Sequence, residues 1–164
     1  MAVAITRRRA LGVIGAATLA ATVSVALIVL PGDDQAEGPP DVRIGEHTCD
    51  QCGMVISDAR FAAGWRAAST TQKRFDDIGC MVARFRAEST DDMQTWVHDY
   101  ETQAWVRTTA ATFVVSADIH SPMGYGVAAF DTAEEATAYV TGHKGETLGW
   151  HALVETLMKR ANDG

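Results

Sequence analysis

The sequence is poor in basic residues once its N-terminal segment is set aside. Residues 7–9 are arginines, and the rest of the chain holds 11 basic against 21 acidic residues, a net charge of −10. Nucleic acids and anionic lipids attract proteins through basic patches. The shortage of basic residues therefore argues against either as a partner of the folded part. An acidic surface is compatible with attracting cations or with docking a basic protein patch.

Cysteine is also scarce. The chain has Cys49, Cys52 and Cys80, and none in its first 48 residues. A structural zinc site closes a tetrahedron, usually with two pairs of closely spaced ligands. Cys49 and Cys52 form one such pair, but Cys80 has no partner at short spacing. A zinc site made of the three cysteines and one histidine stays an alternative that lacks the second pair.

A long run without charge follows the arginines. The 21 residues Ala10–Leu30 contain no charged side chain, and about 20 apolar residues span a bilayer. Residues 1–30 are therefore predicted to be an uncleaved membrane anchor or a cleaved signal, with residues 24–26 (Ser-Val-Ala) as the cleavage site. Because the basic flank stays cytoplasmic, the rest should face the periplasm or cell exterior. The segment Thr6–Leu11 fits twin-arginine export, as an alternative to the general secretory route.

Residues 31–41 are rich in proline, glycine and acid, which is typical of a linker. The folded domain is therefore expected at residues 42–164, with strands at residues 61–68 and 112–116. In residues 75–87, apolar side chains recur at three- and four-residue steps, which predicts an amphipathic helix. The apolar residues of this face are Phe75, Ile78, Val82 and Phe85, and Asp76 and Asp77 provide the carboxylates at its start.

A second helix is predicted at residues 131–141, with Asp131 or Thr132 as the cap and Gly142 as the stop. A phenylalanine-aspartate pair opens each predicted helix, and a tryptophan follows 21 residues later in the first case and 20 in the second. This internal echo predicts two related strand-strand-helix-strand units, each too small to bury a core alone. The expected fold is α+β, with both units packed as one body.

The segment from Cys49 to Met54, Cys-Asp-Gln-Cys-Gly-Met, carries the chemistry. Two thiols at this spacing form a disulfide, exchange disulfides or bind a metal, and outside the cytoplasm the disulfide stays an open alternative. The glycine allows a tight turn, so that the Cys52 thiolate and the Met54 thioether can converge. Thiolate and thioether together favour copper(I) over hard cations. Cys52 and Met54 are therefore candidate copper(I) ligands, and Cys49 is a secondary candidate.

A second soft donor lies in residues 119–126. Methionine normally fills gaps in a core, but Met123 stands in a turn rich in proline and glycine, with no apolar pattern to join. Met123 is therefore a third candidate ligand, with His120 as a secondary one. His47 is an outside candidate, and the other histidines show no metal-site spacing. Cys80 falls off the apolar stripe of the first predicted helix, yet we interpret it as a packed thiol rather than a ligand.

An enzymatic alternative would make Cys49 and Cys52 a thiol-disulfide oxidoreductase. Such pairs usually sit at a helix N-terminus, where the helix dipole lowers the pKa of the thiol. The residues after Cys52 instead predict a turn followed by a strand, which argues against this alternative.

Four motifs, taken in order, resemble those of the NosL family, copper(I)-binding accessory proteins of nitrous oxide reductase maturation. They are Cys52-Gly53-Met54 before a strand, residues 75–81 at the start of a helix, residues 120–126 before a strand, and residues 136–150 ending at Trp150. The resemblance covers roughly residues 48–153. Each motif is short, but their order and spacing together are specific.

The resemblance implies a two-part α+β fold, export, and delivery of copper(I) from a donor to a recipient cuproenzyme such as nitrous oxide reductase, with no enzymatic chemistry. It carries soft-donor roles onto Cys52, Met54 and Met123. Members are typically lipoproteins, lipidated at a cysteine that closes the signal peptide. Since this sequence has no cysteine before Cys49, the apolar run of residues 10–30 would replace the lipid as the membrane link.

Overall fold

The structure, a computed structural model, describes residues 38–68 and 70–163. Within these residues no helix has the length and apolar character needed to cross a membrane. The predicted anchor or signal at residues 1–30 lies outside the described residues, as does most of the predicted linker at residues 31–41.

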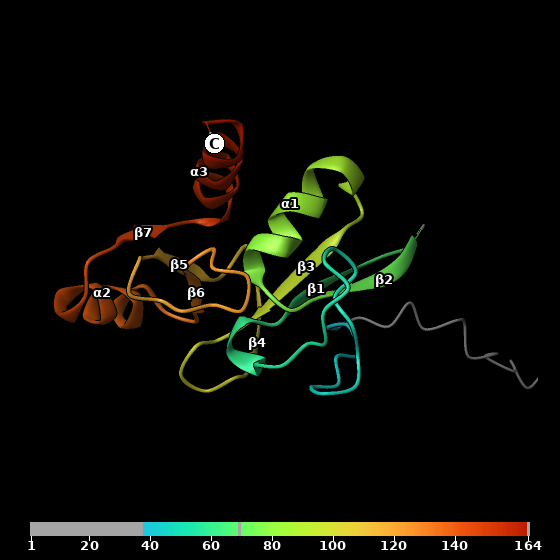
Figure 1. The fold of residues 1–164 in the computed structure, drawn as a ribbon, viewed down its shortest axis with the longest axis horizontal. Helices are drawn as coiled ribbons and strands as arrows, with labels where there is room; N and C mark the ends of the chain where they lie inside the picture. The colour runs from blue at the N-terminus through green and yellow to red at the C-terminus, as the bar shows by residue number, and fades with distance from the viewer. Residues whose placement is uncertain (1–37, 69, 164) are drawn as a thin grey trace, which may run out of the picture. The chain divides into compact units, whose positions relative to one another are not determined.

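Two antiparallel sheets and three α-helices make up the described part of the chain (Figure 1). The elements in chain order are a 3-10 helix η1 at Ala59–Phe61, β1 Ala63–Ala67, β2 Thr70–Phe75, α1 Ile78–Glu88, β3 Gln94–His98, β4 Trp105–Arg107, β5 Thr112–Val115, β6 Val127–Phe130, α2 Ala133–Gly142, β7 Glu146–Leu148 and α3 Trp150–Asp163.

Both halves have the same strand order. The first sheet runs β2-β1-β3-β4 and the second runs β6-β5-β7. In each half the first strand is central and pairs antiparallel with the second and third strands, and a helix connects those two. The predicted strand-strand-helix-strand order is therefore found twice, with β4 added to the first unit and α3 to the second.

The first predicted helix exists, but it begins at Ile78, so the prediction that Phe75 belongs to it is wrong. Phe75 is the last residue of β2 and pairs with Ala63 of β1. Asp77 is extended, with φ −144°, and its side chain caps the helix by accepting a hydrogen bond from the Gly79 amide. The apolar spacing included Phe75 because its side chain enters the same core from the end of the strand.

The second predicted helix is confirmed as α2. Thr132, and not Asp131, is the cap: its hydroxyl accepts from the Glu135 amide, and the Glu135 carboxylate accepts from the Thr132 amide. This reciprocal pair is a capping box. Gly142 is the last helical residue. The strand at residues 112–116 is confirmed as β5, while Phe61 lies in η1 ahead of β1.

The helix α3 was not predicted from the sequence. Trp150 was paired with Trp96 as a repeat position, but Trp96 lies inside β3 whereas Trp150 follows β7 and begins a helix. Trp150, Leu153 and Leu157 are buried along this helix at three- and four-residue steps, which is the pattern of one apolar helix face.

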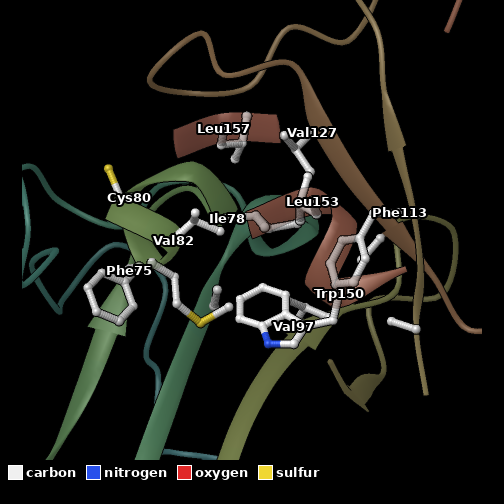
Figure 2. Close-up of a cluster of buried hydrophobic side chains, with 14 of the residues drawn as sticks. Phe75, Ile78, Cys80, Val82, Val97, Phe113, Val127, Trp150, Leu153 and Leu157 are labelled. Atoms are coloured by element: carbon white, nitrogen blue, oxygen red, sulfur yellow. The ribbon is translucent and has the colours of Figure 1, made fainter. Parts of the chain in front are cut away.

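One hydrophobic core joins the two halves (Figure 2). Ile78 and Val82 of α1 meet Phe113 of β5 and the buried face of α3 there, and α1 and α3 lie side by side. Phe85 is half-buried and makes edge contacts with the rings of Trp65 and Trp150. Because the largest core contains side chains from both sheets, the halves pack as one body.

Two strands of the second sheet, β5 and β6, are buried on both faces, while β7 at its edge is largely exposed. Successive side chains of a strand point to opposite faces, and along β5 Phe113 and Val115 join the shared core while Val114 joins a second cluster. That second cluster contains Phe130 and Ala136 and lies under α2.

Candidate metal centre

The segment with two cysteines forms the turn of a short hairpin. Thr48 pairs with Val55 as an isolated antiparallel bridge. The Cys49 amide donates to the Met54 carbonyl oxygen at 2.7 Å, and the Gly53 amide donates to the Cys49 carbonyl oxygen at 2.9 Å. Gly53 has φ +76°, a conformation that glycine adopts without steric cost. The sequence expectation of a tight turn made possible by this glycine is confirmed.

Asp50 fastens this hairpin to the first sheet and to α1. Its amide donates to the Arg74 carbonyl oxygen at 2.8 Å, and its carboxylate accepts from the Arg74 amide at 2.8 Å. Lys73 forms an ion pair with the same carboxylate at 3.2 Å. Arg84, from α1, donates to the Asp50 carbonyl oxygen at 3.2 Å. The thiols on either side of Asp50 are therefore held by a strand and a helix rather than by a free loop.

The third cysteine meets the other two at the start of α1. The Sγ atoms of Cys49, Cys52 and Cys80 all lie within 4.8 Å of one another. Cys49 and Cys80 are buried, at 3% and 1% exposure, and Cys52 is half-buried. Cys80 is the third residue of α1, and Figure 2 shows its sulfur pointing away from the side chains of the hydrophobic core. All three cysteines are free thiols.

Protons are shared unequally within this three-thiol cluster. The hydrogen bond from Cys80, together with the backbone N–H groups of Asp76, Cys52 and Gln51, outweighs burial and lowers the pKa of Cys49 to about 5. The same hydrogen bond to Cys49, with burial and the nearby negative charges, raises the pKa of Cys80. Burial raises the pKa of Cys52. These shifts favour the thiolate form at Cys49 and the protonated form at Cys52 and Cys80.

A soft metal ion fits this arrangement. A thiolate sulfur lies about 2.3 Å from a bound ion such as zinc, so two sulfurs on one ion are at most about 4.6 Å apart. Three sulfurs around one ion would lie about 4.0 Å apart, so the cluster, whose sulfurs lie within 4.8 Å of one another, would contract when it binds the ion. In the part of the chain that the structure describes, no histidine or carboxylate joins the three thiols as a fourth ligand. The geometry therefore suits a three-coordinate soft ion better than a closed tetrahedral zinc site.

The two candidate thioethers lie at the surface. Met54 is 51% exposed and Met123 is 39% exposed. Among the described residues, the other large hydrophobic side chains that are exposed are Ile44 and Val55. The backbone amide of Met54 donates to the Cys52 thiol. The backbone amide of Met123 donates to the Asp77 carboxylate, the cap of the helix that carries Cys80. Their role as ligands stays a prediction.

The histidines have other partners or face solvent. His120 is exposed, with its Nδ1 3.1 Å from the Asp118 carbonyl oxygen. His47 contacts the backbone and side chain of Arg43. His98 is buried and stacks on the ring of Trp105, with centroids 3.7 Å apart. His47 and His98 are thus occupied by neighbouring residues, and the role of His120 as a secondary ligand stays a prediction.

Sequence reasoning missed two contributions to this site. Cys80 was interpreted as a packed thiol, whereas its sulfur belongs to the three-thiol cluster. The ring of Tyr125 lies against Gly79, where any side chain would overlap it, and burial together with the charge of Asp77 raises the pKa of Tyr125. The departure of Cys80 from the apolar stripe was the one signal in the sequence that pointed to its role.

The pair proposed by the enzymatic alternative is placed differently from a redox-active pair. Cys49 and Cys52 lie in a hairpin turn, and it is Cys80 that lies in the first turn of a helix. A helix N-terminus stabilises a thiolate, so its effect acts on the cluster from the side of Cys80.

Comparison with known proteins agrees with this architecture. The family model NosL matches residues 43–158. A curated relative, the copper-binding lipoprotein NosL of Stutzerimonas stutzeri, is 24% identical over 123 residues, which cover 69% of this chain and 65% of that protein. The chain therefore spans slightly less than two thirds of that relative.

The crystal structure of the copper chaperone NosL from Shewanella denitrificans is similar in fold. Its TM-score is 0.59 at 18% identity, over 70% of this chain and 96% of the other. The family model covers the hairpin, both sheets and most of α3. On this match, the chain belongs to the NosL family.

Proposed function

We propose that this protein binds copper(I) outside the cytoplasm and passes it to a partner protein. The observation that carries the proposal is the three-thiol cluster, whose sulfurs lie within 4.8 Å of one another and whose member Cys52 is only half-buried. Relatives named as copper-binding or as copper chaperones share the family and the fold. Soft sulfur ligands select copper(I) over hard cations.

The buried and exposed sulfurs would have separate roles. Cys49 and Cys80 are buried and would retain the ion, while Cys52 is within reach of solvent. Each thiol must lose its proton to bind a metal, and the lowered pKa of Cys49 favours that loss. Met54 and Met123 would add thioethers, which have no proton to lose and so bind copper(I) in mildly acidic surroundings.

Transfer to a partner requires that incoming ligands reach the ion. Cys52 is half-buried, and Met54, Met123, Val55 and Ile44 are exposed. Val55 follows Met54 in the hairpin, and Gly45, next to Ile44, donates its amide to the Ile56 carbonyl oxygen. Exposed apolar side chains often mark a protein contact surface. We propose that a copper donor and a recipient cuproenzyme, such as nitrous oxide reductase, bind at this surface. The protein would exchange ligands there without catalysing a reaction.

Residues 1–30 would hold the protein at the membrane, with the domain facing the periplasm or the cell exterior. The apolar run would take the place of the lipid anchor that the name of the Stutzerimonas stutzeri relative implies. Protease added to intact spheroplasts should then digest residues 42–164. Protection of the domain from protease would refute this location.

The function is tested with the reduced full-length chain and a chromophoric copper(I) chelator as competitor. Wild-type protein should withdraw one copper(I) per chain, and Cys52→Ser should nearly abolish this. Met54→Leu and Met123→Leu keep a similar side-chain volume and should weaken binding while leaving the fold intact.

Cys49→Ser separates two ligand sets. Loss of binding as complete as in Cys52→Ser is expected if Cys49 helps to retain the ion, and binding that survives the substitution would show that Cys49 is only a neighbour. Zinc retained in preference to copper(I) when both are supplied would favour the structural zinc alternative. Turnover in a disulfide-reduction assay would favour the oxidoreductase.

A further inference from the structure

The buried carboxylate of Asp77 binds two segments that are far apart in sequence. Its Oδ1 accepts a hydrogen bond from the Gly79 amide at 2.8 Å, and its Oδ2 accepts one from the Met123 amide at 3.0 Å. Asp77 is 0% exposed. Hydrogen bonds to a buried carboxylate are stronger than those between neutral groups, so both contacts are firmly held.

One oxygen of this carboxylate caps the helix that carries Cys80. Asp77 is the N-cap of α1, and Cys80 is the third residue of that helix. The cap sets where the first helical turn begins. It thereby sets the position of the Cys80 sulfur relative to the hairpin that carries Cys49 and Cys52.

The other oxygen accepts a hydrogen bond from the turn that contains Met123, which belongs to the second half of the molecule. This turn is itself constrained: the Gly124 amide donates to the Ser121 carbonyl oxygen at 2.9 Å, and the Gly126 amide donates to the Ser121 hydroxyl at 3.1 Å. Gly126 has φ +68° and packs so closely on the Ser116 carbonyl that a side chain would overlap it.

A second contact supports the same junction. The ring of Tyr125 rests on Gly79, with no room for a Cβ between them. The first turn of α1 and the turn around Met123 are therefore joined both by a hydrogen bond to a buried carboxylate and by ring packing, beside the cysteine whose sulfur completes the cluster.

We propose that Asp77 is a positioning residue of the copper site, which holds the Met123 turn of the second half against the thiol-bearing helix of the first half. The inference rests on the proposed function, because it assumes that Met123 contributes to copper(I) binding. It makes the site a product of both halves rather than of the cysteine hairpin alone.

Asp77→Asn tests this positioning role. The amide oxygen of asparagine still caps α1, since asparagine is as good a cap as aspartate. Its NH₂ group is a donor and cannot accept from the Met123 amide. Copper(I) affinity of the full-length reduced chain should fall about tenfold, as is typical when an outer partner of a metal ligand is lost.

The matched comparison is a double-mutant cycle with Met123→Leu. If Asp77 acts through Met123, the Asp77→Asn/Met123→Leu variant should lose no more affinity than Met123→Leu alone. The methyl NMR signal of Met123 should shift when copper(I) is added to the wild type and should not shift in Asp77→Asn.

Asp99→Asn is the control. Asp99 is also buried, at 1% exposure, and also joins the halves: it accepts from the Thr102 amide at 2.7 Å and from the Asp131 amide at 2.9 Å. These contacts involve neither α1 nor the Met123 turn, so substitution of Asp99 should change stability and leave copper(I) affinity unchanged.

Equal affinity of Asp77→Asn and wild type, or additive losses in the double variant, would overturn the positioning role. Unchanged affinity in Met123→Leu would overturn it as well. These outcomes are distinguishable from failure of the proposed function, which would appear as no copper(I) binding by the wild type or full binding by Cys52→Ser.

Discussion

The two halves of the molecule share a strand order but use the first turn of their helices differently. In both, a strand ends in phenylalanine, an aspartate follows, and the next residue is the helix cap. The cap is buried Asp77 in the first half and exposed Thr132 in the second. At the third helical position, Cys80 stands where the second half has Glu135, the partner in its capping box.

This difference shows which residues at the start of each helix also make contacts outside that helix. Thr132 and Glu135 satisfy the start of α2 by contacts within that turn. Asp77 satisfies α1 with one oxygen and reaches the other half with the second, and Cys80 makes no capping contact but joins two distant thiols. In the first half, the helical position that completes the capping box in α2 is therefore occupied by a thiol of the three-thiol cluster.

The largest expected effect on copper(I) affinity comes from substituting the third helical residue, which is tested in each half separately. Cys80→Ser should lower copper(I) affinity by more than about 100-fold, since loss of a direct ligand should exceed the 10- to 100-fold cost of losing an outer partner. Glu135→Gln, at the equivalent position, should leave affinity unchanged. Competition with a copper(I) chelator measures both, and equal affinities for Cys80→Ser and wild type would remove Cys80 from the site.

The next test compares a half-buried side chain of α1 with an exposed one of α2 through the free energy of unfolding. Phe85 is half-buried against the rings of Trp65 and Trp150, so Phe85→Ala should lower the free energy of unfolding by about 2–3 kcal/mol, below the 3–5 kcal/mol of a fully buried phenylalanine. Thr137→Ala, on the exposed face of α2, should change it by less than about 0.5 kcal/mol. Chemical denaturation provides both values, and a loss below about 1 kcal/mol for Phe85→Ala would contradict the packing of α1.

A pair of glycines sharpens the comparison further. Gly79→Ala should cost about 1–3 kcal/mol by forcing Tyr125 away from α1. Gly142→Ala, in α2, meets no atom within 4 Å and should stabilise the protein by up to about 1 kcal/mol through helix propensity. The same sign for both changes in chemical denaturation would show that Tyr125 does not press on Gly79.

The smallest expected effect concerns the aspartates that precede the caps. Burial, opposed by hydrogen bonds from Ser57 and reinforced by the charges of Asp77 and Asp58, raises the pKa of Asp76, and its Oδ2 has no hydrogen-bond partner. A raised pKa in the folded state means that stability is fully present below the unfolded pKa and declines as pH rises through the folded value.

Asp76→Asn should therefore be more stable than wild type at neutral pH, with a difference that disappears at low pH. Asp131→Asn, at the exposed counterpart position, serves as the control. Denaturation midpoints across the acidic range measure both variants, and a pH-independent difference for Asp76→Asn would contradict the assignment.

Much of the fold was legible in the sequence because it depends on local patterns. The start of α2 followed from Thr132 and the acidic residues of its first turn, and the repeat of strand-strand-helix-strand followed from two phenylalanine-aspartate pairs. The start of α1 was misplaced because Phe75 continues the apolar spacing of the helix, although it belongs to a strand. The pattern at Trp150, Leu153 and Leu157 was available but was masked by treating Trp150 as a repeat of Trp96.

The candidate site divides in the same way. The sequence by itself determined the soft-donor hairpin of Cys49, Cys52 and Met54, because close spacing and a glycine turn place those groups near one another in any fold. Tertiary structure alone decided that Cys80 joins them and that Asp77 connects α1 to the Met123 turn. The reason is physical: these groups are separated by tens of residues, and only the packing of α1 against the hairpin and of one half against the other brings them together.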